Sequence, residues 1–346
     1  MKIAIDAMGG DHAPAEIVKG CLEACVHTEA ELILVGDRQQ ITDELARSGI
    51  SYDARRISIV HAQEVIENTD SPVRAVRSKP DSSMVRAIEL VRSGEADAAL
   101  SAGNTGALMA AGLLRLGRIK GVERPAIVSI YPLLGQDKAF SLLVDAGANA
   151  ECKASNLLGF AHMGSIYMKS AFGVESPTVG LINIGAEESK GTAQLKETYQ
   201  LLKGSGLNFI GNVEGRVIPA GAADVLVCDG FTGNVVLKLT EGMAWTILKA
   251  VKRRFTEGAI AKLGAAMLSG KLRELKKEFD YSTYGGAPIL GVRGLVIKMH
   301  GSSTALAVRN SVIKAALVAS ADLTGQIRQA MEAAGAEEEG SENDEE

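Results

Sequence analysis

Three glycine-rich loops carry groups that could hold a small anion. Each follows an apolar run and precedes a helical pattern, so free backbone N–H groups and the positive end of a helix dipole converge there. Such a helix start binds phosphate without a basic side chain, and glycine lets the anion approach the backbone closely. The candidate ligands are Ser101, Gly103, Asn104, Thr105 and Gly106 in the first loop, Gly230, Thr232, Gly233 and Asn234 in the second, and His300 and Ser302 in the third.

The same composition also suits helix capping, because Ser, Thr, Asn and Gly are preferred at helix starts. Capping explains any single loop better than anion binding does. Three such loops in one sheet, each directly after a strand, favour a phosphate-handling site at the carboxyl ends of the strands.

Two charged residues are further candidates. Lys190 lies in the loop GAEESKGT (185–192) and could reach into the site as a point charge, although an isolated lysine in a polar loop is usually just exposed. His12 could act as an acid, a base or a phosphate ligand, or could simply hydrogen-bond to the adjacent Asp11. Asp6 lies inside the apolar first strand, so we expect it to be paired or hydrogen-bonded.

Other kinds of catalytic site lack support in the sequence. The motifs GxSxG, HExxH and GxxxxGK[ST] are absent. Cys21 and Cys25 are four residues apart with no second cysteine pair or histidine cluster, so we expect neither a metal nor a cofactor. Cys228 could be a nucleophile, but no base is identifiable beside it, and an inert buried thiol is the stronger interpretation.

Composition narrows the class of protein. The net charge of −5 argues against nucleic-acid binding, since no basic excess is available to neutralise phosphates. The opening MKIAIDAMGG is typical of a first strand rather than a signal peptide, and no apolar run approaches the roughly 20 residues of a membrane span. Four cysteines without a disulfide pattern fit a reduced, cytoplasmic protein.

A strand, a glycine-containing loop and a helical pattern recur along the chain. This alternation predicts an α/β fold, a three-layer α/β/α sandwich around a mostly parallel sheet, with the ligand loops at one edge. We expect one domain over residues 1–336, a C-terminal helix over Ser311–Ala333 and a disordered acidic tail over 337–346. The predicted strands are Lys2–Ala7, Glu31–Val35, Ala96–Leu100, Ser141–Val144, Thr178–Asn183, Asn208–Ile210, Asp224–Val227 and Leu295–Met299.

Residues 250–280 depart from this alternation. Lysines and arginines surround a stripe of Ala, Leu and Met, which predicts a protruding amphipathic helix or helical hairpin. Such a surface could lie on anionic lipid or bind an acidic partner. An ordinary surface helix with a stripe facing the core explains the pattern equally well. The candidate membrane contacts are Leu263, Met267 and Leu268.

Several long motifs resemble those of the bacterial phosphate:acyl-carrier-protein acyltransferases. They are KIAIDAMGGDHAP, SAGNTGALMAAG, VDAGAN, INIGAEESKGT, GNVEGR, DGFTGNVVLK and YGGAPILG followed by IKMHGSS. The resemblance extends to about Leu317 and excludes the acidic tail. It implies a sandwich similar to phosphotransacetylase and β-decarboxylating dehydrogenase folds.

The resemblance also implies a function. The family moves a fatty acyl group from acyl carrier protein to inorganic phosphate, and the acyl-phosphate serves phosphatidic acid and phospholipid synthesis. It implies a homodimer bound peripherally to the inner face of the cell membrane, where a glycerol-3-phosphate acyltransferase uses the product. The family's catalytic lysine and asparagine match Lys190 and Asn234.

A mechanism follows as a hypothesis. Phosphate dianion is already a nucleophile near neutral pH, so the protein needs mainly to position it. Lys190 would offset negative charge, and Asn234 with the N–H groups near Gly233 would donate to the developing oxyanion.

Two rival classes stay open at this point. The start of the chain is similar to the strand-GDGIGPE start of β-decarboxylating dehydrogenases, which leaves an enzyme like these or like phosphotransacetylase. Neither a GxGxxG fingerprint nor a carboxylate cluster supports the dehydrogenase alternative. A non-catalytic protein that binds acyl carrier protein or lipid is the second rival, but it leaves the anion-binding loops unexplained.

Overall fold

The computed structural model describes residues 1–133, 138–256, 258, 270 and 284–343, with the backbone alone after Ala333. Its centre is an 11-stranded sheet in the order β3-β2-β1-β4-β11-β10-β5-β6-β9-β7-β8. The strands are β1 (Lys2–Asp6), β2 (Glu31–Gly36), β3 (Ile57–His61), β4 (Ala98–Ser101), β5 (Ala126–Pro132), β6 (Phe140–Val144), β7 (Val179–Asn183), β8 (Phe209–Glu214), β9 (Val225–Val227), β10 (Ala287–Leu290) and β11 (Leu295–Lys298).

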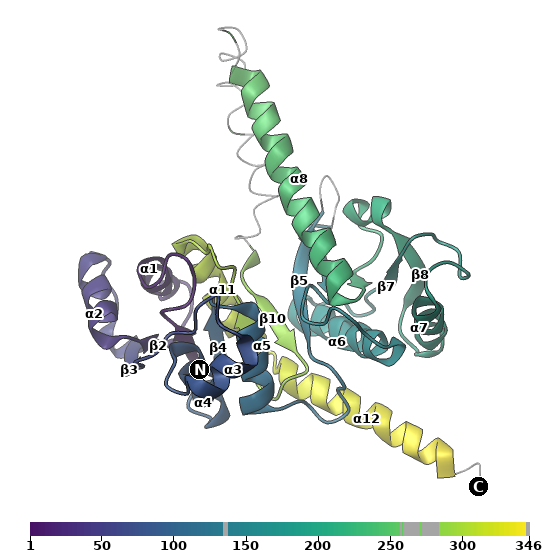
Figure 1. Ribbon diagram of the computed structural model, residues 1–346, viewed down its shortest axis with the longest axis horizontal. Coiled ribbons are helices and arrows are strands. Elements are labelled where there is room, and N and C mark those ends of the chain that lie inside the picture. The colour runs from purple at the N-terminus through teal and green to yellow at the C-terminus, as the bar shows by residue number, and fades with distance from the viewer. Residues whose placement is uncertain (134–137, 257, 259–269, 271–283, 344–346) are drawn as a thin grey trace.

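Helices cover both faces of this sheet (Figure 1). The α-helices are α1 (Ala15–Ala24), α2 (Arg38–Arg47), α3 (Pro72–Ser78), α4 (Ser83–Arg92), α5 (Thr105–Ala111), α6 (Ala154–Phe172), α7 (Ala193–Gly204), α8 (Gly230–Thr256), α11 (Ala305–Ser320) and α12 (Leu323–Asn343). Shorter turns are the 3-10 helices η1 (Ala54–Arg56) and η3 (Gly215–Ala220) and the π-helix η2 (Gly112–Leu116). The predicted three-layer architecture is confirmed.

The sheet consists of two parallel halves that run in opposite directions. β1, β2, β3, β4 and β11 are mutually parallel, as are β6, β7, β8 and β9. Between them, β11–β10, β10–β5 and β5–β6 all pair antiparallel, so direction reverses three times. The carboxyl ends of the two halves therefore point to opposite edges, and the expectation of a single ligand edge is wrong.

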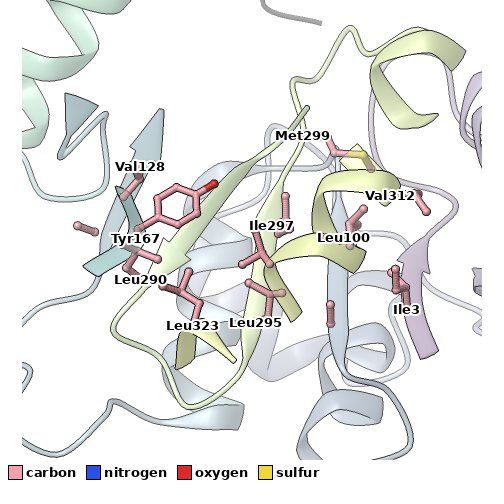
Figure 2. Close-up of a cluster of buried hydrophobic side chains, with 14 of the residues drawn as sticks. Ile3, Leu100, Val128, Tyr167, Leu290, Leu295, Ile297, Met299, Val312 and Leu323 are labelled. Atoms are coloured by element: carbon pink, nitrogen blue, oxygen red, sulfur yellow. The ribbon is translucent and has the colours of Figure 1, made fainter. Parts of the chain in front are cut away.

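Alternation along the strands builds a core on each face. In β1, Ile3 and Ile5 face the core that includes α1, α6 and α11, while Ala4 faces the core of α4 and α5. The first core is continuous across the middle of the sheet. Figure 2 shows Leu100 of β4, Ile297 of β11 and the side chains of β5 and β10 meeting residues of α6, α11 and α12. This shared core holds the two halves together and fixes the space between them.

Helix α8 projects far beyond the sheet (Figure 1). It enters the predicted amphipathic segment 250–280, whose membrane-contact candidates Leu263, Met267 and Leu268 lie outside the described residues. Among the described residues, no helix combines the length and apolarity needed to cross a bilayer.

The C-terminal region differs from the expected single helix. It forms α11 and α12, because Asp322, with a φ of 47°, interrupts the helix between Ser320 and Leu323. α12 continues to Asn343, where the sequence predicts a disordered tail, and the many Ala and Glu residues there are strong helix formers.

Candidate active site

A cavity of about 360 Å³ lies between the two halves of the sheet. Its walls come from the start of α5, the strand β5, one face of α8, and the segments on either side of the β10–β11 hairpin. The lining residues that bear on its chemistry are Thr105, Gly147, Asn234, Lys238, Glu241, Gly286, Lys298 and His300.

The loop 145–149 after β6 brings the two halves to this cavity. The buried Asp145 carboxylate accepts the N–H groups of Ile127 at 3.0 Å and Asn149 at 2.7 Å, among others. Burial raises the pKa of Asp145, and these hydrogen bonds oppose that rise. The loop therefore folds back over β5, so that Gly147 lines the same two cavities as Thr105 although their strands end at opposite edges.

The start of α8 packs directly on this loop. A Cβ on Gly233 would lie 1.9 Å from the Asp145 carbonyl oxygen, so only glycine fits. Asp229 Oδ1 accepts the Thr232 N–H at 2.7 Å, and the Thr232 hydroxyl donates to Asp229 Oδ2 at 3.1 Å. Asn234 follows, exposed, with its side chain at the cavity. These contacts anchor the start of α8, and Asn234 is the polar group there that lines the cavity.

The start of α5 uses most of its polar groups internally. Buried Ser101 donates to Asp6 Oδ2 at 2.6 Å and accepts the Gly103 N–H at 3.0 Å. Asn104 caps α5 through the Ala107 N–H at 3.0 Å. Asp6 is thus hydrogen-bonded, as its place in an apolar strand predicts. Thr105 is exposed and lines the cavity.

Three basic side chains converge on the opposite wall. Lys238 lies one turn after Asn234 on α8, and its Nζ is 3.4 Å from His300 Nε2. Lys298 ends β11, and its Nζ donates to Ala102 O at 3.4 Å and to Met299 O. Burial lowers the pKa of Lys298 to about 8 and lowers that of His300, with a further contribution from Lys238 to both. The two lysine ammonium groups next to the His300 imidazole form a site for an anion, although Lys238 is also paired with Glu241 Oε2 at 3.0 Å.

Comparisons with known proteins give this site a context. The family described as "Fatty acid synthesis protein" matches residues 1–325. A phosphate acyltransferase of Alkaliphilus oremlandii is 53% identical over 312 residues, which is 90% of this chain and 92% of that protein. Another, from Thermoanaerobacter pseudethanolicus, is 49% identical over 97% of this chain and 99% of its own length.

The chain belongs to the phosphate acyltransferase family. Its fold is also that of a phosphotransacetylase from Streptococcus pyogenes, with a TM-score of 0.64 at 15% identity over 92% of this chain and 94% of that one. The predicted likeness to phosphotransacetylase folds is confirmed. The chain is therefore an acyltransferase of fatty acid and lipid synthesis, and the cavity has to be interpreted as a site for that chemistry.

The cavity of this phosphate acyltransferase-family chain contains part of the predicted site. Thr105, Asn234 and His300 line it together. Gly106 lines an adjoining cavity. Ser302 supports His300, because its hydroxyl lies 2.9 Å from His300 Nδ1. The predicted residues Ser101, Gly103, Asn104, Gly230, Thr232 and Gly233 shape the loops without lining either cavity.

Three further candidates lie elsewhere. Lys190 is exposed in the loop after β7, where its N–H donates to Glu187 O at 3.0 Å, and it lines neither cavity. His12 is exposed beside Asp11, whose N–H donates to Gly301 O at 2.8 Å, so it lies near the third loop but outside the lining. Cys228 is buried, and burial raises the pKa of its thiol, as expected for an inert cysteine.

Sequence reasoning missed Lys238 and Lys298. Lys298 left a signal, since it ends the apolar run of β11 just before the His300 loop, much as Asp6 interrupts β1. The sequence signal for Lys238 is weaker: its spacing of four residues from Asn234 places both side chains on one face of α8.

Proposed function

We propose that the chain transfers a fatty acyl group from acyl carrier protein to inorganic phosphate in the cavity between α5, α8 and β11. The convergence of Lys238, Lys298 and His300 with the amide of Asn234 supports this most directly. These groups suit a phosphate and the oxyanion of an attacked thioester. No motif for an alternative nucleophile accompanies them in the sequence.

The chemistry needs little beyond positioning and charge. A phosphate oxygen attacks the thioester carbonyl carbon, the new C–O bond forms, and the C–S bond breaks to release the carrier thiolate, which takes up a proton. Lys298 and Lys238 hold the phosphate and offset its charge, while Asn234 donates to the developing oxyanion. Preorganised donors of this kind contribute about 3 kcal/mol each to transition-state stabilisation.

The catalytic roles of Lys190 and Asn234 stay proposals. Purified chain with acyl carrier protein thioester should form acyl-phosphate only when phosphate is present, as measured by mass spectrometry. Asn234→Ala should lower kcat about 10²- to 10³-fold. Asn208→Ala is the matched control, since Asn208 is exposed and lines neither cavity. Lys190→Ala tests the residue that the family resemblance alone supports, and normal turnover in both variants would remove Lys190 and Asn234 from the mechanism.

We also propose a homodimer formed through α8. Its face away from the cavity carries an apolar stripe with residues every fourth position, a spacing that keeps them on one side of a helix. The stripe consists of Phe231, Val235, Leu239, Met243 and Ile247, each about half or more exposed. A second copy of the chain would bury it. Leu239→Glu should then yield monomers in light scattering, whereas Leu317→Glu on α11 should not; a dimer that survives Leu239→Glu contradicts this.

The expected location is the cytoplasm, at the inner face of the membrane, where the product would pass to a glycerol-3-phosphate acyltransferase. Support comes from the exposed Lys249, Lys252 and Arg253 near the end of α8, which suit anionic lipid or an acidic carrier. Leu263→Glu or Met267→Glu should release the protein from anionic vesicles in a flotation assay. Unchanged vesicle binding by both variants would exclude these residues as the contact.

A further inference from the structure

A second cavity of about 370 Å³ adjoins the first. Its wall is built by α3, α5 and the π-helix η2, a rare form of helix that is frequent at functional sites. Long apolar side chains and small residues line it, and among the described residues no charged side chain does. The lining consists of Val73, Thr105, Gly106, Met109, Ala110, Leu113, Leu114, Ile127, Gly147 and Ala148.

The two cavities are adjacent. Thr105, Ile127 and Gly147 line both, so they form the boundary between the cationic space and the apolar one. At the outer side, Val73 is 50% exposed and Leu114 is 46% exposed, although both are large and apolar. Apolar side chains left open to solvent next to a polar site are typical of a surface that binds an apolar ligand.

The geometry points to the second cavity as the binding site for the acyl chain of the substrate, with Met109 and Leu113 setting its length. This assignment rests on the proposed function, because it takes the first cavity as the place where phosphate meets the thioester. A molecule with a charged head and an apolar tail can then lie across both spaces with its carbonyl near Thr105 and Gly147.

The apolar lining suits the acyl chain of the donor better than the carrier end of the thioester. The carrier end of an acyl thioester bears amides, which need hydrogen-bond partners when buried. Within the described lining, Thr105 offers the one polar side chain, and it lies at the boundary with the first cavity. Methylene groups need no partner and gain from leaving water.

A substitution that shortens the apolar space should act on long chains alone. Leu113→Trp fills part of the cavity, and excluding two methylenes corresponds to about a 15-fold loss. We therefore expect kcat/KM for 16- and 18-carbon donors to fall about 15-fold or more, while 8- and 10-carbon donors change less than about twofold. Met109→Trp, from the same wall, should give the same dependence and is the second variant if Leu113→Trp does not fold.

The control is Leu201→Trp, because Leu201 is exposed on α7 and lines neither cavity. Thermal unfolding of each variant establishes that it is folded. Equal losses at every chain length, or no loss at any, would overturn the assignment while leaving the proposed function intact. A wild-type chain that discharges no donor of any length in the presence of phosphate would instead overturn the proposed function, and the assignment with it.

Discussion

The two cavities have walls of opposite chemistry. The wall of α8 and β11 holds Lys238, Lys298 and His300, whereas the wall of α5 and η2 holds Met109 and Leu113. The difference separates two tasks. Under the proposed function, the cationic wall acts on a negatively charged reaction centre that every substrate shares, and the apolar wall acts on the part in which substrates differ. Changes to the first should lower activity for all donors, and changes to the second should alter selectivity.

Loss of the Lys298 ammonium should have the largest effect. Lys298→Met removes a cation that would face the proposed phosphate in the cavity, so kcat/KM for phosphate should fall about 10²- to 10³-fold. The fall should be the same for donors of 8 and 18 carbons. Lys196→Met, an exposed lysine on α7, is the control. A loss that depends on chain length would show that the two walls do not act separately.

The pH dependence of kcat/KM for phosphate should also report on Lys298. Burial lowers the pKa of Lys298 to about 8, so its charged form declines above that pH. If phosphate binding needs the cation, kcat/KM for phosphate falls above pH 8, by up to about tenfold per pH unit. Lys298→Arg keeps its charge and should not show this fall. A fall that persists in Lys298→Arg would belong to another group.

The cationic wall also depends on a close backbone contact, between Gly233 of α8 and the Asp145 carbonyl, that is tighter than the contacts of the apolar wall. Gly233→Ala would place its Cβ against the Asp145 carbonyl, so α8 must shift. We expect a loss of about 1–3 kcal/mol in the free energy of unfolding, measured by urea denaturation. Gly242→Ala is a matched control on the same helix, because a Cβ there meets open space and should stabilise α8 by about 0.5–1 kcal/mol. Equal effects of the two substitutions would contradict this account of how α8 is held.

This contrast also explains which site residues could be predicted from the sequence. Polar residues in the glycine-rich loops were good candidates, but Ser101, Asn104 and Thr232 satisfy groups of the protein itself. Capping and anion binding use the same donors and acceptors, so composition alone does not separate them. Lys298 needed a different criterion, which is a charge at the end of an apolar strand.

The fold, too, has features that the sequence predicts and features that it does not. The alternation of strands and helices predicts the sandwich, because it reflects local periodicity. The reversal between the two halves was missed, since β5 and β10 were not among the predicted strands and since pairing partners leave no local pattern. Only the folded chain brings Gly147 and Thr105 into the lining of the same two cavities.

A third lysine, Lys314, contacts the backbone that lines the first cavity. Lys314 on α11 is partly buried, and its Nζ donates to the carbonyl of Gly286, which lines the first cavity, at 3.1 Å. It also lies over the Tyr167 ring, 5.8 Å from the centroid. Burial lowers the pKa of Lys314 to about 7. The folded protein therefore binds fewer protons than the unfolded chain above pH 7, up to the ordinary pKa of lysine.

Stability should then rise with pH in that window because of Lys314. The expected slope is about 1 kcal/mol per pH unit between pH 7 and 9 in the difference between wild type and Lys314→Met, since Lys298 contributes equally to both. Lys314→Met should thus gain most over wild type near pH 6, where the buried lysine is charged. Urea unfolding at pH 6, 7, 8 and 9 measures this difference. A constant difference would mean that Lys314 keeps its charge throughout, with the Gly286 carbonyl and the Tyr167 ring compensating for its burial.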